Sequence, residues 1–152
     1  NLLQLFLNHQ FFSNTFPKTS GPEIFNLDYI EERLQSLSHE TLTKEDVMAT
    51  LNELTALSIC NAIDFYLKDK HNAEIIVSGG GIHNPLLMSK IKNHFTHHRV
   101  CTSMEIGINP DAKEAILFAI LANETISGNR ETFRTGNLNM PNISMGKICL
   151  PE

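Results

Sequence analysis

Apolar positions recur at helical spacing in several parts of this 152-residue chain. The clearest pattern predicts a helix over about residues 44–68, because Thr43-Lys44-Glu45-Asp46 resembles a capping box and a broad apolar stripe follows it. The breadth of the stripe indicates a helix that packs on a sheet. Its members are Val47, Met48, Leu51, Leu54, Ile59, Ala62, Ile63, Tyr66 and Leu67.

Two short runs of β-branched residues predict strands beyond this helix. The continuous apolar stretch in residues 74–78 favours a buried parallel strand, and Arg99-Val100-Cys101-Thr102 favours a second one. Between them, Asn84 is a good N-cap and Pro85 a good first helical residue. The helix that they predict carries Leu87, Ile91 and Phe95 on one face.

Asn109-Pro110-Asp111 repeats the Asn-Pro helix start and predicts a helix over about residues 110–126, which Gly128 ends. Its many alanines allow a neighbouring backbone to approach closely. The last 24 residues are rich in Asn, Gly, Thr and Pro, so we expect loop with one short strand near Ile148.

The N-terminal part contains a predicted irregular loop. Residues 1–12 are apolar enough for a short helix or a strand end, whereas two prolines and a glycine exclude a regular element over residues 16–25. Asn26 or Asp28 can then cap a helix. The apolar positions of that helix are Ile30, Leu34 and Leu37.

From residue 44 the predicted order is helix, strand, helix, strand, helix. This alternation implies right-handed crossovers and a parallel pair of strands in an α/β layer. Two strands are few for a doubly wound fold. Either further strands are present, or the rest of the sheet lies in sequence outside this chain.

Composition narrows the class of protein. Apolar types make up 41% and charged types 19%, which argues against wholesale disorder, and the net charge of −5 makes a broad nucleic-acid-binding face unlikely. No apolar run is long enough for a membrane span, and the N-terminal residues predict no signal peptide. Three distant cysteines without a CxxC motif favour reduced thiols in the cytoplasm. The start at Asn1, in mid-pattern, suggests a piece of a longer protein.

The segment with the strongest ligand chemistry is Ser78-Gly79-Gly80-Gly81, between a predicted strand and a predicted helix N-terminus. Open α/β sheets bind ligands at the carboxyl ends of their strands, and helix N-termini favour anions. The segment is neither a P-loop nor a dinucleotide fingerprint. A tight strand-to-helix turn with no ligand explains these glycines about equally well.

Two charged residues are further candidates. Glu114 can accept hydrogen bonds from sugar or ribose hydroxyls, but an acid in a first helical turn is often only a partner of the helix dipole. Lys18 lies beside Thr19 and Ser20 and can meet a phosphate, although such a lysine is more often simply exposed.

His94, His97, His98 and Cys101 have metal-like spacing. A zinc site needs three or four such side chains to converge. The histidines sit at a predicted helix C-terminus and the cysteine in a strand, so we predict no metal site. No Ser-His-Asp arrangement and no pair of catalytic carboxylates can be recognised.

Taken together, four stretches resemble the C-terminal half of the anhydro-N-acetylmuramic acid kinase family, which is similar to the actin, hexokinase and Hsp70 superfamily of two-domain ATPases. They occur in one order and span nearly the whole chain. The stretches are Phe16-Pro17-Lys18-Thr19-Ser20-Gly21-Pro22-Glu23-Ile24-Phe25, Ala49-Thr50-Leu51-Asn52-Glu53-Leu54-Thr55-Ala56, Ser78-Gly79-Gly80-Gly81-Ile82-His83-Asn84-Pro85-Leu86-Leu87-Met88 and Gly107-Ile108-Asn109-Pro110-Asp111-Ala112-Lys113-Glu114-Ala115-Ile116-Leu117-Phe118-Ala119.

The resemblance implies a fold and an activity. The fold is a partial ribonuclease H-like (actin-like ATPase) domain of class α/β, a few-stranded sheet packed with helices, with residues 1–152 as the C-terminal lobe of a two-domain sugar kinase. The complete enzyme would use ATP and Mg²⁺ to cleave and phosphorylate 1,6-anhydro-N-acetylmuramic acid, giving N-acetylmuramic acid 6-phosphate in cytoplasmic cell-wall recycling.

The resemblance also assigns residues. Gly79, Gly80, Gly81 and Asn84 become nucleotide-binding candidates, and Glu114 and Lys18 substrate-binding candidates. The family's phosphate loop and catalytic base belong to the N-terminal lobe, which is absent here, so we carry over no catalytic residue. Pro22 stands where the family loop has Arg, and Thr135-Gly136-Asn137 departs from a terminal TGA-type segment.

The sequence is compatible with several functions. We expect the chain alone to be inactive as a kinase. It is alternatively a non-catalytic, nucleotide-binding or regulatory half-kinase, or part of another sugar or acyl kinase of the same superfamily. Pairing of an exposed sheet edge with a second copy, as a homodimer, is also left open.

Overall fold

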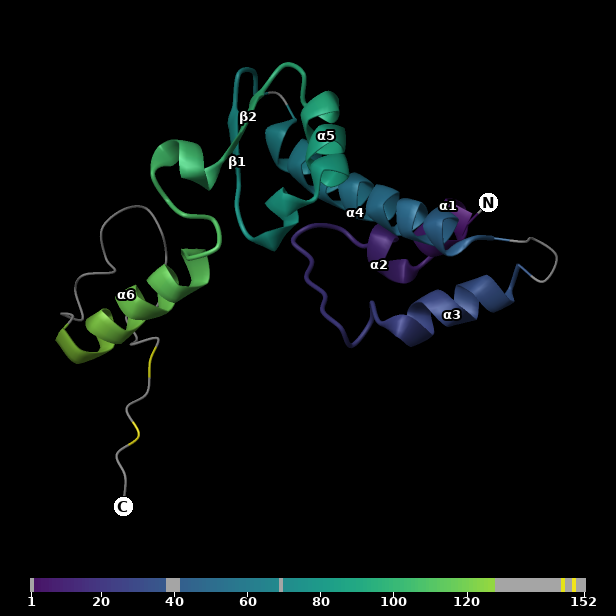
Figure 1. Ribbon diagram of the computed structural model, residues 1–152, viewed down its shortest axis with the longest axis horizontal. Helices are drawn as coiled ribbons and strands as arrows, with labels where there is room; N and C mark the ends of the chain where they lie inside the picture. Colours follow the sequence, from purple (N-terminus) through teal and green to yellow (C-terminus); the bar gives the residue numbers. More distant parts are fainter. Residues whose placement is uncertain (1, 38–41, 69, 128–145, 147–148, 150–152) are drawn as a thin grey trace. The chain divides into compact units, whose positions relative to one another are not determined.

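The computed structural model describes residues 2–37, 42–68, 70–127, 146 and 149 (Figure 1). It divides the chain into two compact units, Asn1–Cys101 and Thr102–Glu152. Most of the described residues are helical, and the strands form a small parallel sheet of order β1-β2. The expected mixture of helices with a few-stranded sheet is therefore confirmed at this level.

The first unit contains most of the regular elements. They are α1 (Leu2–Leu7), α2 (Gln10–Ser13), α3 (Leu27–Gln35), α4 (Lys44–Leu67), β1 (Glu74–Val77), the 3₁₀ helix η1 (Gly80–His83), α5 (Pro85–His94) and β2 (Arg99–Thr102), whose last residue begins the second unit. The predicted order from residue 44 is thus confirmed as far as β2.

Polar side chains fix the starts of α3 and α4. The backbone N–H of Asp46 donates to Thr43 Oγ1 at 3.1 Å, and the N–H of Thr43 donates to Asp46 Oδ2 at 3.1 Å, which completes the predicted capping box. For α3 the cap is Asn26, whose Oδ1 accepts from Tyr29 N at 2.9 Å. Asp28 lies instead in the first turn of that helix.

The C-terminal half of α4 belongs to one hydrophobic core, which we call the α4–α5 core. The predicted face of α5 is buried in it, with Ile91 only 1% exposed. Both strands contribute a side chain to this core, so the predicted packing of α4 on a sheet is confirmed. The buried members are Ala56, Cys60, Leu87, Ile91 and Phe95, joined by Ile59, Ile63, Leu67, Ile75 and Val100.

The N-terminal half of α4 belongs to a second core with α1 and α3 (Figure 1). Its buried members are Leu2, Phe6, Tyr29 and Leu54. Ile30, Leu34 and Leu37, the predicted apolar face of α3, pack against them. The long helix α4 therefore connects two hydrophobic clusters within the first unit.

The sheet departs from the sequence prediction in its burial. Successive residues of β1 alternate between exposed and half-buried, and Ile76 is 46% exposed. The predicted parallel strand is confirmed, but the prediction that it is buried is wrong. The reason is that successive side chains point to opposite faces, and Ile75 packs on the α4–α5 core while Ile76 faces away from it.

The second unit contains the 3₁₀ helix η2 (Ser103–Ile106) and α6 (Lys113–Ser127). The prediction that α6 starts at Pro110 is wrong by three residues. Asn109 O accepts from Ala112 N at 3.1 Å, so Pro110 to Ala112 form a tight turn before the α-helix. Gly128 and the strand expected near Ile148 lie outside the described residues. Within the described ranges, no helix combines the length and apolarity needed to cross a membrane.

Candidate functional site

The glycine segment forms an open corner between β1 and α5. Gly79 has φ +90°, a left-handed conformation that favours glycine, and it precedes the short helix η1. A Cβ added at Gly79 or Gly80 would meet no heavy atom within 4 Å, and one added at Gly81 would reach only Leu87 Cδ2, at 3.7 Å. These glycines therefore leave space beside the backbone that side chains would fill.

The corner is held in place by hydrogen bonds that end in a helix cap. Gly79 O accepts from Ile82 N at 3.2 Å, and Gly81 O accepts from Asn84 N at 3.1 Å. Asn84 Oδ1 then accepts from Leu87 N at 3.1 Å, which is the predicted N-cap of α5. The partial positive charge at the N-terminus of α5 thus lies directly after the open glycine corner.

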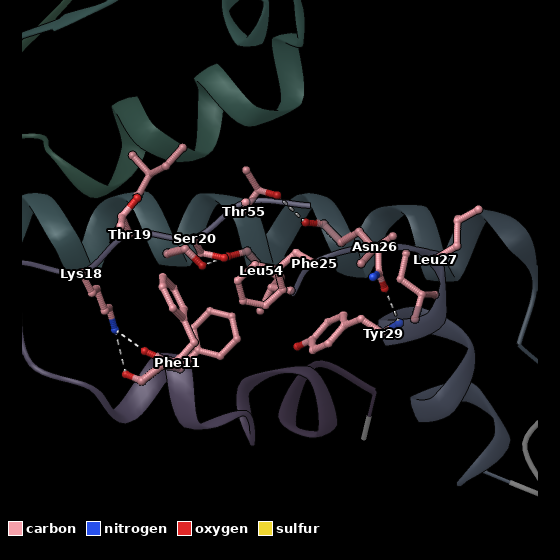
Figure 2. A pocket seen from close by; sticks show the side chains of 16 residues that line it. Phe11, Lys18, Thr19, Ser20, Phe25, Asn26, Leu27, Tyr29, Leu54 and Thr55 are labelled. Carbon is pink, nitrogen blue, oxygen red and sulfur yellow. Dashed lines mark hydrogen bonds between the residues drawn. The ribbon is translucent and has the colours of Figure 1, made fainter. Parts of the chain in front are cut away.

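A second feature of the first unit is a cavity of about 860 Å³ beside the loop that precedes α3 (Figure 2). Its walls come from α2, this loop, the start of α3 and the middle of α4. The volume falls within the range of about 300–1,000 Å³ that is typical of small-molecule sites. The lining residues are Phe11, Phe12, Lys18, Thr19, Ser20, Gly21, Phe25, Asn26, Leu27, Tyr29, Ile30, Leu51, Leu54, Thr55, Ser58 and Ile59.

Lys18 lines this cavity and is hydrogen-bonded to backbone oxygens of α2. Its ammonium donates to Phe11 O at 2.8 Å and to Phe12 O at 3.1 Å. The same nitrogen lies 4.8 Å from the ring centroid of Phe11 and 4.7 Å from that of Phe16. These contacts hold the cation at one end of the cavity (Figure 2).

The hydroxyls around the cavity differ in their hydrogen bonding. Thr55 and Ser58 donate to backbone oxygens one turn earlier in α4, at 2.8 and 2.6 Å. Tyr29 donates to Phe6 O at 2.6 Å, and burial raises the pKa of this phenol although the nearby Arg33 guanidinium acts in the opposite direction. Ser20 Oγ is buried and has no hydrogen-bond partner among the described residues. The cavity therefore includes one polar atom whose hydrogen bonding is unmet.

Glu114 lies in the first turn of α6, in the second unit, and is exposed. The glycine corner and Lys18 both lie in the first unit. Gly79, Gly80, Gly81 and Asn84 are brought together in one corner, but none of them lines the cavity that holds Lys18. The sequence candidates thus fall into three places along the chain, not one.

Two of the histidines with metal-like spacing, His94 and His98, have other partners. His94 Nε2 lies 2.7 Å from Asp64 Oδ2, which joins α5 to α4. His98 Nδ1 accepts from Ala73 N at 3.1 Å, and Cys101 is buried in β2. In the part of the chain that the structure describes, no three His, Cys, Asp or Glu side chains are grouped as a metal site would require.

The aromatic wall of the cavity was not predicted as part of a site. Phe11, Phe12 and Phe25 lie on either side of the Pro- and Gly-containing loop, and Tyr29 follows in α3. The density of phenylalanines around that loop was the signal in the sequence. Their convergence depends on the packing of α2 and α3 against α4, which local periodicity does not specify.

Comparisons with known proteins agree on one family. The family model described as anhydro-N-acetylmuramic acid kinase matches residues 1–148. A protein of that name from Pseudoalteromonas atlantica is 45% identical over 158 residues, which cover 99% of this chain and 38% of the relative. A namesake from Caldanaerobacter subterraneus subsp. tengcongensis is 36% identical over 145 residues, covering 95% of this chain and 37% of the relative.

A third similar protein of the same name, from Crocosphaera subtropica, is 43% identical over 122 residues, covering 80% of this chain. The chain thus spans well under half the length of these relatives, with shares of 38%, 37% and 32%. Most of each relative therefore lies outside the region that can be compared.

Proposed function

Because this chain belongs to the anhydro-N-acetylmuramic acid kinase family, we propose that it forms the nucleotide-binding part of an ATP-dependent sugar kinase. The substrate of the complete enzyme would be 1,6-anhydro-N-acetylmuramic acid, phosphorylated during cytoplasmic cell-wall recycling. The lobe would be a partial ribonuclease H-like domain, to which sequence outside this chain adds the remaining strands.

The observation that carries the proposal is the open glycine corner. Nucleotides approach protein backbone closely only where side chains are absent, and Gly80 is exposed with free space where a Cβ would stand. The N-terminus of α5, capped by Asn84, follows at once and favours a negatively charged group. The shape and the polarity of this corner therefore both fit a nucleotide.

Within this proposal the chain's own residues bind and position. The glycine corner would hold the nucleotide against the backbone, and Lys18, in the same unit, would bind the sugar. Glu114, in the second unit, is a further candidate for binding substrate. Alignment of the sugar oxygen with the terminal phosphate, together with exclusion of water, is the main requirement of phosphoryl transfer. Mg²⁺ would supply charge neutralisation for the phosphates, with ligands from ATP and from residues beyond those described here.

A nucleotide titration tests the proposal directly. We expect the 152-residue chain to bind ATP in calorimetry, and we expect Gly80→Val to weaken that binding at least tenfold, because the added side chain would occupy space left for the ligand. The fold should survive, since Gly80 lacks a positive φ and a Cβ at this position would meet no heavy atom within 4 Å. An exposed control, Thr96→Val, should bind as the unsubstituted chain does.

Absence of heat at millimolar ATP would overturn the assignment of the glycine corner. Equal affinities of the Gly80→Val chain and the unsubstituted chain would contradict it as well. Circular dichroism of both variants separates lost binding from lost structure.

A second function is favoured by the same corner. The glycine turn is fully formed within the first unit, which supports a regulatory half-kinase that would bind nucleotide without catalysis. ATP binding combined with no turnover under any reconstitution with the rest of a relative would support this alternative.

A further inference from the structure

The second unit contains a helix, α6, whose middle is entirely apolar. Residues 115–122 read Ala-Ile-Leu-Phe-Ala-Ile-Leu-Ala, whereas the charged and polar residues of this helix lie toward its two ends. Eight consecutive residues make more than two full turns of an α-helix, so apolar side chains project from every side of this stretch. A helix that is apolar on all sides is typical of a protein core.

The structure nevertheless leaves this helix uncovered. All residues of α6 are described, and none of them is buried. Phe118 is 66% exposed, and within residues 115–122 only Leu121 is half-buried. Soluble proteins expose continuous apolar surface of this kind chiefly where a partner covers it. The exposed surface of α6 therefore indicates an interface.

The side chains of α6 suit contacts on more than one side. Ala115, Ala119 and Ala122 recur at spacings of four and three, which places them together and lets another backbone approach closely. Leu117 and Phe118 are successive residues, so their bulky side chains project in directions about 100° apart. Small residues on one side and large ones on others fit a helix that lies between two packed layers.

The length of the relatives identifies what covers α6. This chain spans 38% of the Pseudoalteromonas atlantica relative and 37% of the Caldanaerobacter relative, so the greater part of each lies outside the match. A second copy of this chain, paired helix to helix, would contact α6 along one stripe and leave its other sides exposed. The remaining part of the same protein is large enough to surround the helix.

We infer that α6 is an interior helix of the complete protein, and that the part outside this chain covers it with an apolar surface of its own. This inference rests on the proposal that the chain is one lobe of a longer kinase. It concerns how the protein is assembled, and it requires no nucleotide.

Thiol footprinting tests whether α6 is covered. Phe118→Cys and a control, Thr96→Cys, are each treated with a maleimide, and the label is located by peptide mass spectrometry. Both positions are exposed, so the fold should survive and both new thiols should react rapidly in the 152-residue chain alone. Co-expression with the part of the Pseudoalteromonas atlantica relative outside the match should slow labelling at position 118 at least tenfold and leave labelling at position 96 unchanged.

Two results of the footprint would overturn the inference. Slow labelling at position 118 in the chain alone would show that the chain covers α6 itself. Equal rates at that position with and without the remaining part would show that α6 stays exposed.

A pair of charged variants then tests the apolar character of the contact. Phe118→Asp should weaken the complex with the remaining part at least tenfold, because an unpaired carboxylate is costly to bury. The matched control is Met48→Asp, since Met48 is 65% exposed and lies on α4, in the first unit. This control should leave the affinity unchanged. A stable dimer of the chain alone that Phe118→Asp disperses would overturn the inference, because a second copy would then cover α6.

The outcome is separable from that of the nucleotide proposal. ATP titration reports on the glycine corner, in the first unit, whereas the footprint reports on α6, in the second. Protection of α6 without ATP binding would leave the assembly standing and remove the nucleotide site. ATP binding with an α6 that stays exposed would do the reverse.

Discussion

Thr43 and Asp46 exchange backbone and side-chain hydrogen bonds at the start of α4, the longest helix described. Loss of an N-cap hydroxyl exposes a backbone N–H that has no partner in the helix. We expect Thr43→Ala to lower the free energy of unfolding by about 1 kcal/mol, measured by urea denaturation. The matched control is Thr50→Ala, because alanine is the better helix former in a helix interior. A control as destabilising as Thr43→Ala would contradict the role of the cap.

The same cap makes stability depend on pH. The hydrogen bonds from the Thr43 hydroxyl and backbone to the Asp46 carboxylate lower the pKa of Asp46 below its ordinary value. A pKa lower in the folded than in the unfolded state contributes stability above the unfolded pKa, and that contribution is lost as the pH falls through the folded pKa. Asp46→Asn should therefore lower the unfolding midpoint at neutral pH, and the difference from the unsubstituted chain should shrink in acid. A difference that grows in acid would show that the sign is wrong.

Thiol reactivity distinguishes the three cysteines. Cys60 and Cys101 are buried whereas Cys149 is exposed. Burial first, and then the negative charges of Asp64 and Glu53, raise the pKa of the Cys60 thiol, which lowers its thiolate fraction. We expect a chromogenic disulfide reagent at pH 8 to modify Cys149 rapidly and the buried thiols only on unfolding. Cys149→Ser should remove the rapid phase, and a rapid phase that persists would contradict the assignment.

Among elements, α4 and α5 depend on each other most. Their shared core buries Ile91, and two polar pairs, Glu53 with Lys90 and Asp64 with His94, link the same helices. Ile91→Ala should lower the free energy of unfolding by about 2–5 kcal/mol, because a fully buried side chain leaves a cavity. Leu86→Ala, on the same helix but 50% exposed, should have a much smaller effect. Calorimetric unfolding of both variants would measure the difference.

The elements that local pattern predicts well are those whose signals are local. The Thr43-to-Asp46 box and Asn84-Pro85 mark helix starts through hydrogen bonds within one turn, and both starts are confirmed. The start of α6 was misplaced because Pro110 is the second residue of a tight turn that begins at Asn109. The burial of β1 was overestimated because burial depends on what covers each face, which an apolar run does not record.

The candidate site likewise has one part that the sequence could predict and one part that it could not. The glycine corner could be predicted, since Gly79, Gly80 and Gly81 stand together in the sequence before a helix start. The cavity could not be predicted, because its walls join α2, a loop, the start of α3 and α4, and the lining residues range along the sequence from Phe11 to Ile59. Lys18 was found through its loop motif alone. Its hydrogen bonds to the carbonyl oxygens of Phe11 and Phe12 depend on the fold and could not be predicted from that motif.

At the scale of the whole molecule, the most important fact is that the chain matches only part of each relative's length. The chain spans 38% of the length of its Pseudoalteromonas atlantica relative, so most of that relative lies outside the matched region. Phosphoryl transfer requires a positioned nucleophile and groups that stabilise the charge of the transferring phosphate. If, as we propose, the chain is one lobe of a two-lobe kinase, it would bind a nucleotide but would not exclude water from both sides of the reacting phosphate.

We therefore expect the isolated 152-residue chain, supplied with ATP, Mg²⁺ and 1,6-anhydro-N-acetylmuramic acid, to form no sugar phosphate detectable by ³¹P NMR. The full-length Pseudoalteromonas atlantica relative serves as the reference for turnover. Co-expression of this chain with the part of that relative outside the match should restore measurable phosphorylation, because the two parts together would surround the phosphate. Gly80→Val should abolish the restored activity, whereas Thr96→Val should not. Turnover by the chain alone would refute the expectation, since all catalytic groups would then lie within these residues.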